Sequence, residues 1–268
     1  MTYHLPHRSV LSLAVAVSTL ASTSLAFAEE TKDTTKDEAA QEEAPGTKTH
    51  SLGFRARALT IPKYVIGMFA DGGASVDGYQ FGLEYGTKKR NFETIVALSY
   101  TTYGMDAVPF KGKSDPDTGW EKVDVNLSVV YATVDFLWST DLSPKWSILY
   151  GGSGGLGIVF GTFHRHQLTP TAGSTAGDPS TYVPCVPTNG DGTQYVGPTN
   201  VYCGNDNDHY GRDEPTWLSG GSKPFVMPWL ALQTGVRFQA SDQFALRLDA
   251  GLGVTGFFLG LGGQYGLL

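Results

Sequence analysis

The sequence predicts an all-β fold, a transmembrane antiparallel up-and-down β-barrel of about eight strands. Three observations predict it. Apolar and polar residues alternate with a period of two along most of the chain after residue 51. The connections between the alternating segments are long and short in turn, and aromatic residues gather near the expected strand ends. Outer-membrane barrels have this loop asymmetry and two aromatic girdles.

The N-terminal segment has the pattern of a secretory signal peptide over residues 1–28. Arg8 precedes a short apolar stretch, and Ala26-Phe27-Ala28 forms a small-x-small cleavage site. Residues 29–50 are rich in Glu, Asp, Lys, Thr and Ala and contain no large apolar side chain, so they are expected to form a disordered, acidic periplasmic linker. The barrel is expected over residues 51–268.

Eight strands are expected, each with one apolar face and one face of Gly, polar or charged residues. In chain order they cover residues 52–60, 78–86, 92–100, 123–138, 146–161, 226–238, 244–254 and 257–267. In the fourth strand the apolar phase slips near Val129-Val130, which predicts a β-bulge at that point.

The expected connections assign the polarity of the barrel. Long ones cover residues 62–75, 104–121 and 164–223, and short ones cover 86–91, 139–145 and 239–243. Periplasmic turns are short and external loops long, so both termini are placed on the periplasmic side and loop 164–223 outside the cell. The segment from Pro62 to Ala70 is too apolar for a free external loop. It is expected either to rest on the barrel rim or to plug the barrel mouth.

Charged residues on the non-apolar faces must point away from lipid. They are predicted to form a charge network in the lumen, which in a barrel of eight strands is only wide enough for side chains to fill. The predicted members are Arg55, Arg57, Glu84, Glu93, Asp124, Arg237, Arg247 and Asp249.

Two cysteines, Cys185 and Cys203, lie in one hydrophilic stretch of a chain expected to be secreted. Because the compartment is oxidising, a disulfide between them is the favoured interpretation. Two free thiols are the alternative. Neither cysteine has the spacing of a metal site. The closed loop would be stabilised by about 3 kcal/mol.

From Leu52 to Leu268 the chain resembles small bacterial outer-membrane β-barrel proteins, similar in size to the transmembrane domain of outer membrane protein A. The resemblance implies a multi-pass protein of the cell outer membrane that contacts outer-membrane lipid and lipopolysaccharide and is assembled by the barrel-assembly machinery. Members of this class commonly end in an aromatic residue, whereas this chain ends in Leu268.

For function, we expect a non-enzymatic, monomeric barrel with a structural or surface-contact role, whose long disulfide-closed loop meets an unknown extracellular partner. A narrow porin-like channel is the first alternative. The second is a lipid-A-modifying barrel enzyme that would combine His164 or His166 with Ser153 and Glu93. No catalytic residue, metal, cofactor or nucleic acid is expected, and the net charge of −7 disfavours nucleic acid.

Two weaker patterns have plainer explanations. Gly152, Gly154 and Gly157 match a dinucleotide-loop spacing, but they lie within an expected strand with no helix after it. Residues 205–208, together with Asp213 and Glu214, carry the oxygen ligands that Ca²⁺ prefers, without the spacing of an EF-hand.

Overall fold

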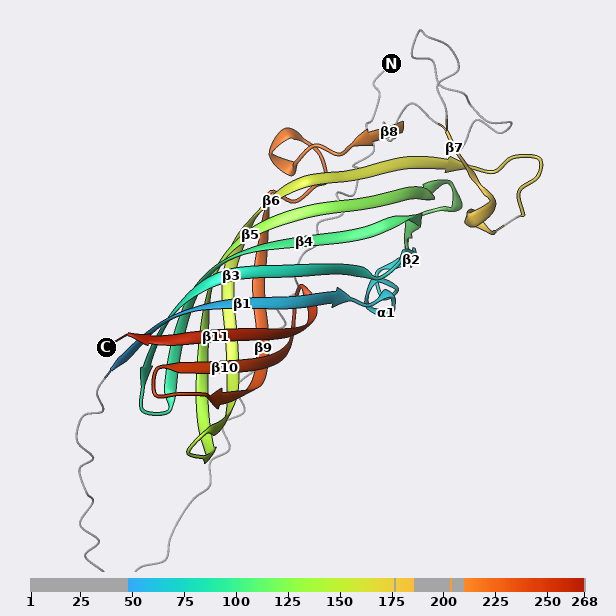
Figure 1. Ribbon diagram of the computed structural model, residues 1–268. Helices are drawn as coiled ribbons and strands as arrows, with labels where there is room; N and C mark the ends of the chain where they lie inside the picture. The colour runs from blue at the N-terminus through green and yellow to red at the C-terminus, as the bar shows by residue number, and fades with distance from the viewer. Residues whose placement is uncertain (1–47, 176, 186–202, 204–209, 268) are drawn as a thin grey trace, which may run out of the picture. The chain divides into compact units, whose positions relative to one another are not determined.

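The computed structural model describes residues 48–175, 177–185, 203 and 210–267. Antiparallel β-strands dominate this part of the chain (Figure 1). The predicted signal peptide, most of the predicted linker, residues 204–209 and the terminal Leu268 lie outside the described residues.

The barrel wall is made of eight long strands, as predicted. They are β1 (Thr49–Ile61), β3 (Val76–Lys89), β4 (Phe92–Gly112), β5 (Glu121–Ser143), β6 (Trp146–Thr169), β9 (Val226–Gln239), β10 (Phe244–Gly253) and β11 (Gly256–Leu267). Each pairs antiparallel with its neighbours in the order β4-β3-β1-β11-β10-β9-β6-β5, and a further β4–β5 pairing closes the ring. Within the described residues the first and last strands pair with each other, so the wall has no free edge over this height.

The alternation expected from the sequence fixes which side chains face outward. On β3, Tyr79, Phe81 and Leu83 are more than 60% exposed, whereas the intervening Gln80 and Glu84 are buried. The neighbouring strands have the same arrangement, in which leucines and aromatic rings point out and polar groups point in. Apolar-out and polar-in is the arrangement of a barrel wall that faces lipid. The predicted fold class is confirmed.

Short turns join the strands at one end of the barrel, where β1 begins and β11 ends. Between β3 and β4 the turn has only two residues, and between β9 and β10 it covers residues 240–243. The long connections lie at the opposite end, together with one short turn between β10 and β11. We call the end with the long connections the outer end.

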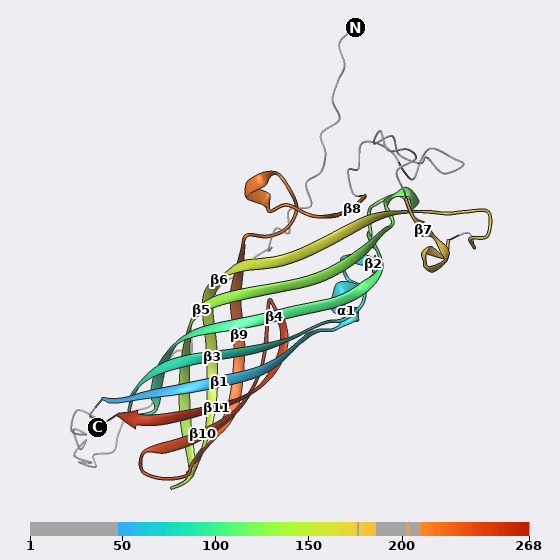
Figure 2. The ribbon, with the colours of Figure 1, turned by 45° about the horizontal axis from the view of Figure 1, so that its top comes forward.

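Strand occupies part of two predicted loops, so their predicted bounds are wrong. β4 continues to Gly112 and β5 begins at Glu121, so most of 104–121 is paired, and β6 continues to Thr169, into the expected loop 164–223. These three strands have 21, 23 and 24 residues, against 13 in β1. They run on past the ends of the other strands (Figures 1 and 2).

The bulge predicted near Val129-Val130 is also wrong. Pairing with β4 and β6 passes through both residues without a shift, and the irregularities of these ladders lie elsewhere, between Met105 and Val108 and between Asp141 and Ser143. The apolar residues of β5 change from one face of the strand to the other because its outward face passes from apolar to polar surroundings. Below this point Val134, Phe136 and Trp138 lie on the outward face, and above it Val123, Val125 and Leu127 face in, towards a core inside the extended strands.

Short elements decorate the outer end. Between β1 and β3 lie the one-turn helix α1 (Lys63–Ile66) and β2 (Ala70–Gly72), which extends the sheet beside β4. Along the upper edge of β6 lie β7 (Val183–Pro184) and β8 (Tyr210–Asp213). The extended parts of β4, β5 and β6, with β2, β7 and β8, form a sheet that continues beyond the barrel wall. We call it the projecting sheet.

Candidate functional site

The lower part of the barrel interior holds a buried network of charges. Arg55 donates from Nε to Glu84 Oε2 (2.8 Å) and from Nη2 to Asp135 Oδ2 (2.9 Å). Arg247 donates to the same Glu84 oxygen at 3.0 Å. Arg55, Glu84 and Asp135 expose 3% of their surface or less, so each charge depends on its partners rather than on water.

Two further groups of polar side chains border this cluster. Arg57 donates to Asp249 Oδ2 at 2.7 Å and to Gln233 Oε1 at 3.0 Å. Nearer the turn end, Arg237 is ion-paired with Glu93, which also accepts a hydrogen bond of 3.0 Å from the amide of Gln264. Four arginines therefore meet four carboxylates in these described residues, and the network is electrically neutral.

The structure places seven of the eight predicted network residues in this interior. Asp124 is the exception, and its assignment is wrong: it is exposed on the outward face of β5, opposite His164 of β6. The fourth acid is Asp135, eleven residues further along the same strand. A bulge at Val129-Val130 would place Asp124 on the inward face, but β5 pairs through this point without a shift.

Above the charges the interior is apolar and filled. Trp229 is fully buried and packs against Tyr131 and Phe258, with ring centroids 5.3 and 5.8 Å apart, and its indole N–H donates to Ser153 Oγ at 2.8 Å. The Arg57 guanidinium lies over the Phe258 ring, 4.4 Å from its centroid, and joins the two layers. Further members of this core are Leu59, Tyr103, Leu127, Val129, Val159 and Ala231.

A second group of charges lies above this core, on the inner face of the projecting sheet. Arg165 donates from Nε to Glu121 Oε2 at 2.6 Å and from Nη1 to Ser222 Oγ at 3.2 Å. Glu214 accepts from the same serine at 2.9 Å and is 3.8 Å from Arg165. Arg165 therefore ties the segment after β8 to the sheet.

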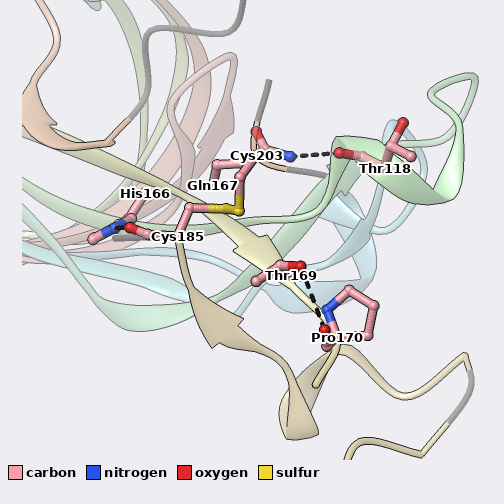
Figure 3. The surroundings of a disulfide bond; sticks show 7 residues. All are labelled: Thr118, His166, Gln167, Thr169, Pro170, Cys185 and Cys203. Carbon is pink, nitrogen blue, oxygen red and sulfur yellow. Dashed lines mark hydrogen bonds between the residues drawn. A yellow bond between two sulfur atoms is a disulfide. The ribbon is translucent and has the colours of Figure 1, made fainter. Parts of the chain in front are cut away.

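At the tip of the projecting sheet a disulfide links Cys185 to Cys203, as predicted, with 5.7 Å between their Cα atoms. Both cysteines are buried against the end of β6 (Figure 3). The Cys185 N–H donates to the Gln167 carbonyl at 2.8 Å, and the Gln167 side-chain amide donates to the carbonyl of Thr118 in the β4–β5 connection (Figure 3). A small core of Trp120, Leu168 and Tyr182 supports the same region.

The outward face of the projecting sheet is polar. His164 and His166 lie within β6, not in a loop, opposite Asp124 and Lys122 of β5. The His164 Nδ1 atom is 3.1 Å from Asp213 Oδ1, and His166 Nε2 is 2.6 Å from the Cys185 carbonyl oxygen. Both imidazoles therefore have partners that fix their orientation.

The residues considered for a hydrolase do not come together. Ser153 and Glu93 face the interior, where Trp229 and Arg237 contact them, whereas His164 is on the outward face. Ser153 and His164 are also eleven residues apart on β6, on the order of 35 Å along the strand.

Of the two weaker sequence patterns, one lies within a strand and the other lies partly outside the described residues. Gly152, Gly154 and Gly157 are all within β6. Residues 205–208 are outside the described part of the chain, while Asp213 and Glu214 already have partners. Among the described residues no cluster of His, Cys, Asp or Glu could hold a metal ion. In the same residues, no helix has the length and apolar character needed to cross a membrane.

Comparisons with known proteins give likeness in structure only. No family model matches the sequence, and no curated protein matches it. The crystal structure of Neisserial surface protein A matches 81% of this chain and 96% of its own length, with 10% identity and a TM-score of 0.39. That of Ail, the attachment invasion locus protein of Yersinia pestis, matches 84% and 100%, with 12% identity and a TM-score of 0.33. The wall of eight paired strands with an apolar outward face agrees with the predicted resemblance to small outer-membrane barrels.

Proposed function

We propose that the protein is an integral barrel of the bacterial outer membrane with a non-enzymatic role, and that its projecting sheet holds a disulfide-closed loop against a partner outside the cell. The wall strands carry exposed apolar side chains on their outward face, and we call this band the outward belt. It supports the membrane location. On β5 this belt runs from Trp138 to Val130, which corresponds to about 20 Å of height for a strand tilted by roughly 40°. Outer-membrane barrels carry an apolar band about 25 Å tall.

The length of the three neighbouring strands β4, β5 and β6 is the main observation that supports the proposed contact role. From Ser128 to Glu121, β5 continues for roughly 25 Å beyond the belt, with polar residues outward and apolar residues inward. Such an extension has its own core and needs no lipid. A rigid platform of this kind lowers the entropy cost of presenting a loop to a partner.

The platform ends at the disulfide. Cys185 and Cys203 are anchored to the sheet, so the segment between them is tethered at both ends. That segment, residues 186–202, is composed largely of Thr, Asn, Gly, Pro, Val and Tyr and carries one formal charge. Tyrosine, glycine and asparagine are enriched in the binding loops of antibodies, where they provide aromatic contact area and adaptable hydrogen bonds.

The experiment has two arms. Cell fractionation with heat-modifiable gel migration tests the membrane location, and a soluble protein that does not shift would refute it. For contact, residues 187–201 are replaced by a Gly-Ser linker that keeps both cysteines, and cells displaying each form are incubated with a glycan array and with immobilised matrix proteins. We expect binding by the full chain and loss of binding by the variant, with the gel shift unchanged. Equal binding by both forms, or none by either, would refute the contact role.

The packing of Trp229, Tyr131 and Phe258 bears on the channel alternative. These rings occupy the interior above the charge network and contact each other, so ions would need to displace them. We therefore expect a closed baseline in planar lipid bilayers. Steady conductance steps from folded, purified protein would favour the channel instead.

A further inference from the structure

The turn end of the barrel carries a compact group of basic residues. The two-residue turn between β3 and β4 begins with Arg90, which follows Lys89. Lys48 directly precedes β1, and the first residue of β1 pairs with Lys88. Figure 1 shows the β3–β4 turn at the end of the barrel where β1 begins. We call the exposed Lys48, Lys89 and Arg90 the basic cluster.

Arg90 has a backbone conformation that its side chain disfavours. Its φ is 54°, and no other non-glycine residue in the described ranges has a positive φ. In this conformation the Cβ atom of an ordinary residue comes close to the following carbonyl oxygen. Two-residue hairpin turns therefore prefer Gly, Asn or Asp at such a position. A residue kept in a disfavoured conformation motivates a hypothesis of function, and here the residue is a fixed positive charge.

The basic cluster lies at the lower border of the outward belt. Lys89 pairs with Phe92 of β4, and Phe92 pairs with Trp138 of β5. The Phe92 and Trp138 rings are in contact, with centroids 5.1 Å apart, and Trp138 is 43% exposed on the outward face. Aromatic rings at the border of a membrane belt favour the depth of the head groups. The register therefore puts the basic cluster at the depth of lipid phosphates.

The β3–β4 turn is also recessed relative to its neighbour. The Ser139 N–H donates to the Asn91 carbonyl at 2.7 Å, so this turn ends at the level of Ser139. β5 continues to Ser143 before the chain turns back. A recessed turn beside the wall is more accessible to a lipid that packs against the wall than to a polymer in the periplasm.

We propose that the basic cluster binds the head group of an anionic phospholipid, such as phosphatidylglycerol, in the leaflet at the turn end. The proposal rests on the membrane location proposed above. Each Lys or Arg near an anionic surface adds attraction, and a guanidinium can donate two hydrogen bonds to one phosphate. Glu93 on β4 does not neutralise the cluster, because it faces inward and is ion-paired with Arg237. A Gly or Asn at position 90 would suit the turn but would not supply the charge.

The test compares lipids with different head groups at one point of the wall. Both native cysteines are joined in the buried disulfide, so a full-length Thr87→Cys variant can be labelled selectively with the fluorophore NBD. Thr87 is on β3, two residues before Lys89 and on the same face. The protein is folded into phosphatidylcholine vesicles, and the label is titrated with spin-labelled phosphatidylglycerol or spin-labelled phosphatidylcholine. The two quenching curves give a relative association constant for the anionic lipid. Leu232→Cys, which is on β9 within the belt and is 74% exposed, reports on bulk lipid.

Each basic residue beside an anionic surface contributes about a fivefold preference, so two of them predict a relative association constant of about 25 at position 87 and one near 1 at position 232. Arg90→Asn and Lys89→Gln should each reduce the constant at 87 about fivefold. Lys145→Asn is the matched control, because it removes one exposed positive charge at the same end, in the turn between β5 and β6, and it should leave the constant unchanged. Since Asn tolerates the left-handed conformation, Arg90→Asn should not lower the urea midpoint of unfolding.

Equal constants at positions 87 and 232 would overturn the proposal. A lower urea midpoint for Arg90→Asn with an unchanged constant would show that Arg90 serves only the turn, and would overturn it too. Binding of the full chain to insoluble peptidoglycan that is lost in Arg90→Asn, with the constant at 87 unchanged, would assign the cluster to the cell wall instead. If neither lipid quenches the label at 232, the membrane location is refuted, and the lipid site with it.

Discussion

Replacing Asp135 by Asn tests the charge network most directly. The change keeps the shape of the side chain and removes one of the four carboxylates that balance four buried arginines. Arg55 would then share Glu84 with Arg247, and one positive charge would have no counterpart. Leaving a buried charge uncompensated costs about 3–5 kcal/mol. The free energy of unfolding should fall by that amount.

The matched control is Asp124→Asn. Both aspartates are on β5, eleven residues apart, but Asp124 is exposed and Asp135 is fully buried. A surface substitution of this kind changes stability by less than about 0.5 kcal/mol. The assay is urea unfolding in lipid vesicles, followed by tryptophan fluorescence and by gel migration. At an m-value of roughly 2–3 kcal/mol/M, Asp135→Asn should lower the midpoint by about 1–2.5 M and Asp124→Asn should barely move it.

A double variant separates pairing from a general effect of position 135. Arg55→Gln with Asp135→Asn removes both members of a pair 2.9 Å apart. The two losses should be non-additive, with the double variant more stable than their sum predicts by about 0.5–3 kcal/mol. Equal midpoint shifts for Asp124→Asn and Asp135→Asn, or strictly additive losses in the double variant, would refute the network described above.

Three other predictions follow from packing and cross-linking. A Cβ at Gly157 would lie 2.4 Å from a valine methyl group of β5, whereas one at Gly154 meets nothing closer than 3.7 Å, so in the same urea assay Gly157→Ala should cost about 1–3 kcal/mol and Gly154→Ala little. Trp229→Ala should lower the free energy of unfolding by about 3–5 kcal/mol, and a loss below 1 kcal/mol would show that the upper core is loosely packed. Replacing Cys185 and Cys203 by Ser should destabilise the closed loop by about 3 kcal/mol. Limited proteolysis should then cleave the projecting sheet faster while the gel shift of the barrel is retained.

The strands could be predicted from the sequence because lipid imposes one rule on each of them. On β3, every second residue from Tyr79 to Tyr85 is apolar and the residues between are Gly or polar, so both the strand and its outward face follow from the pattern. The same period of two continues through β9, β10 and β11. It therefore also predicts that Arg237, Arg247 and Asp249 face inward. These assignments needed no knowledge of pairing.

The projecting sheet could not be predicted, because the same rule reverses within one strand. In β5, Val123, Val125 and Leu127 look like a lipid-facing row, yet they face the core. A reversal of surroundings and a one-residue bulge give the same letter pattern at Val129-Val130. Only the continuous register with β4 and β6 distinguishes them. The wrong assignment of Asp124 follows from this ambiguity, whereas Asp135 lies between the outward Val134 and Phe136 and faces inward under either interpretation.

Contacts between distant segments were equally out of reach. Arg165 meets Glu121 from β5 and Glu214 from the segment after β8, and nothing local to any of the three indicates the others. The disulfide was easier, because a chain with two cysteines offers a single internal pairing.

The reversal in β5 also marks the level at which the apolar outward face of the barrel ends. Outward residues change from apolar to polar within two residues of register on three adjacent strands: Tyr100 is followed by Thr102 on β4, Val130 by Ser128 on β5, and Phe160, opposite Ser128, by Thr162 on β6. The Tyr100 hydroxyl bridges this level through a 2.7 Å hydrogen bond to Ser128 Oγ. The interior changes over the same region, from the buried charges around Asp135 to the core around Val129. Where the outward face of these strands is polar, their apolar residues face in and pack against each other. The projecting sheet is therefore stabilised by its own apolar core, as a soluble protein is, and does not depend on lipid for that stability.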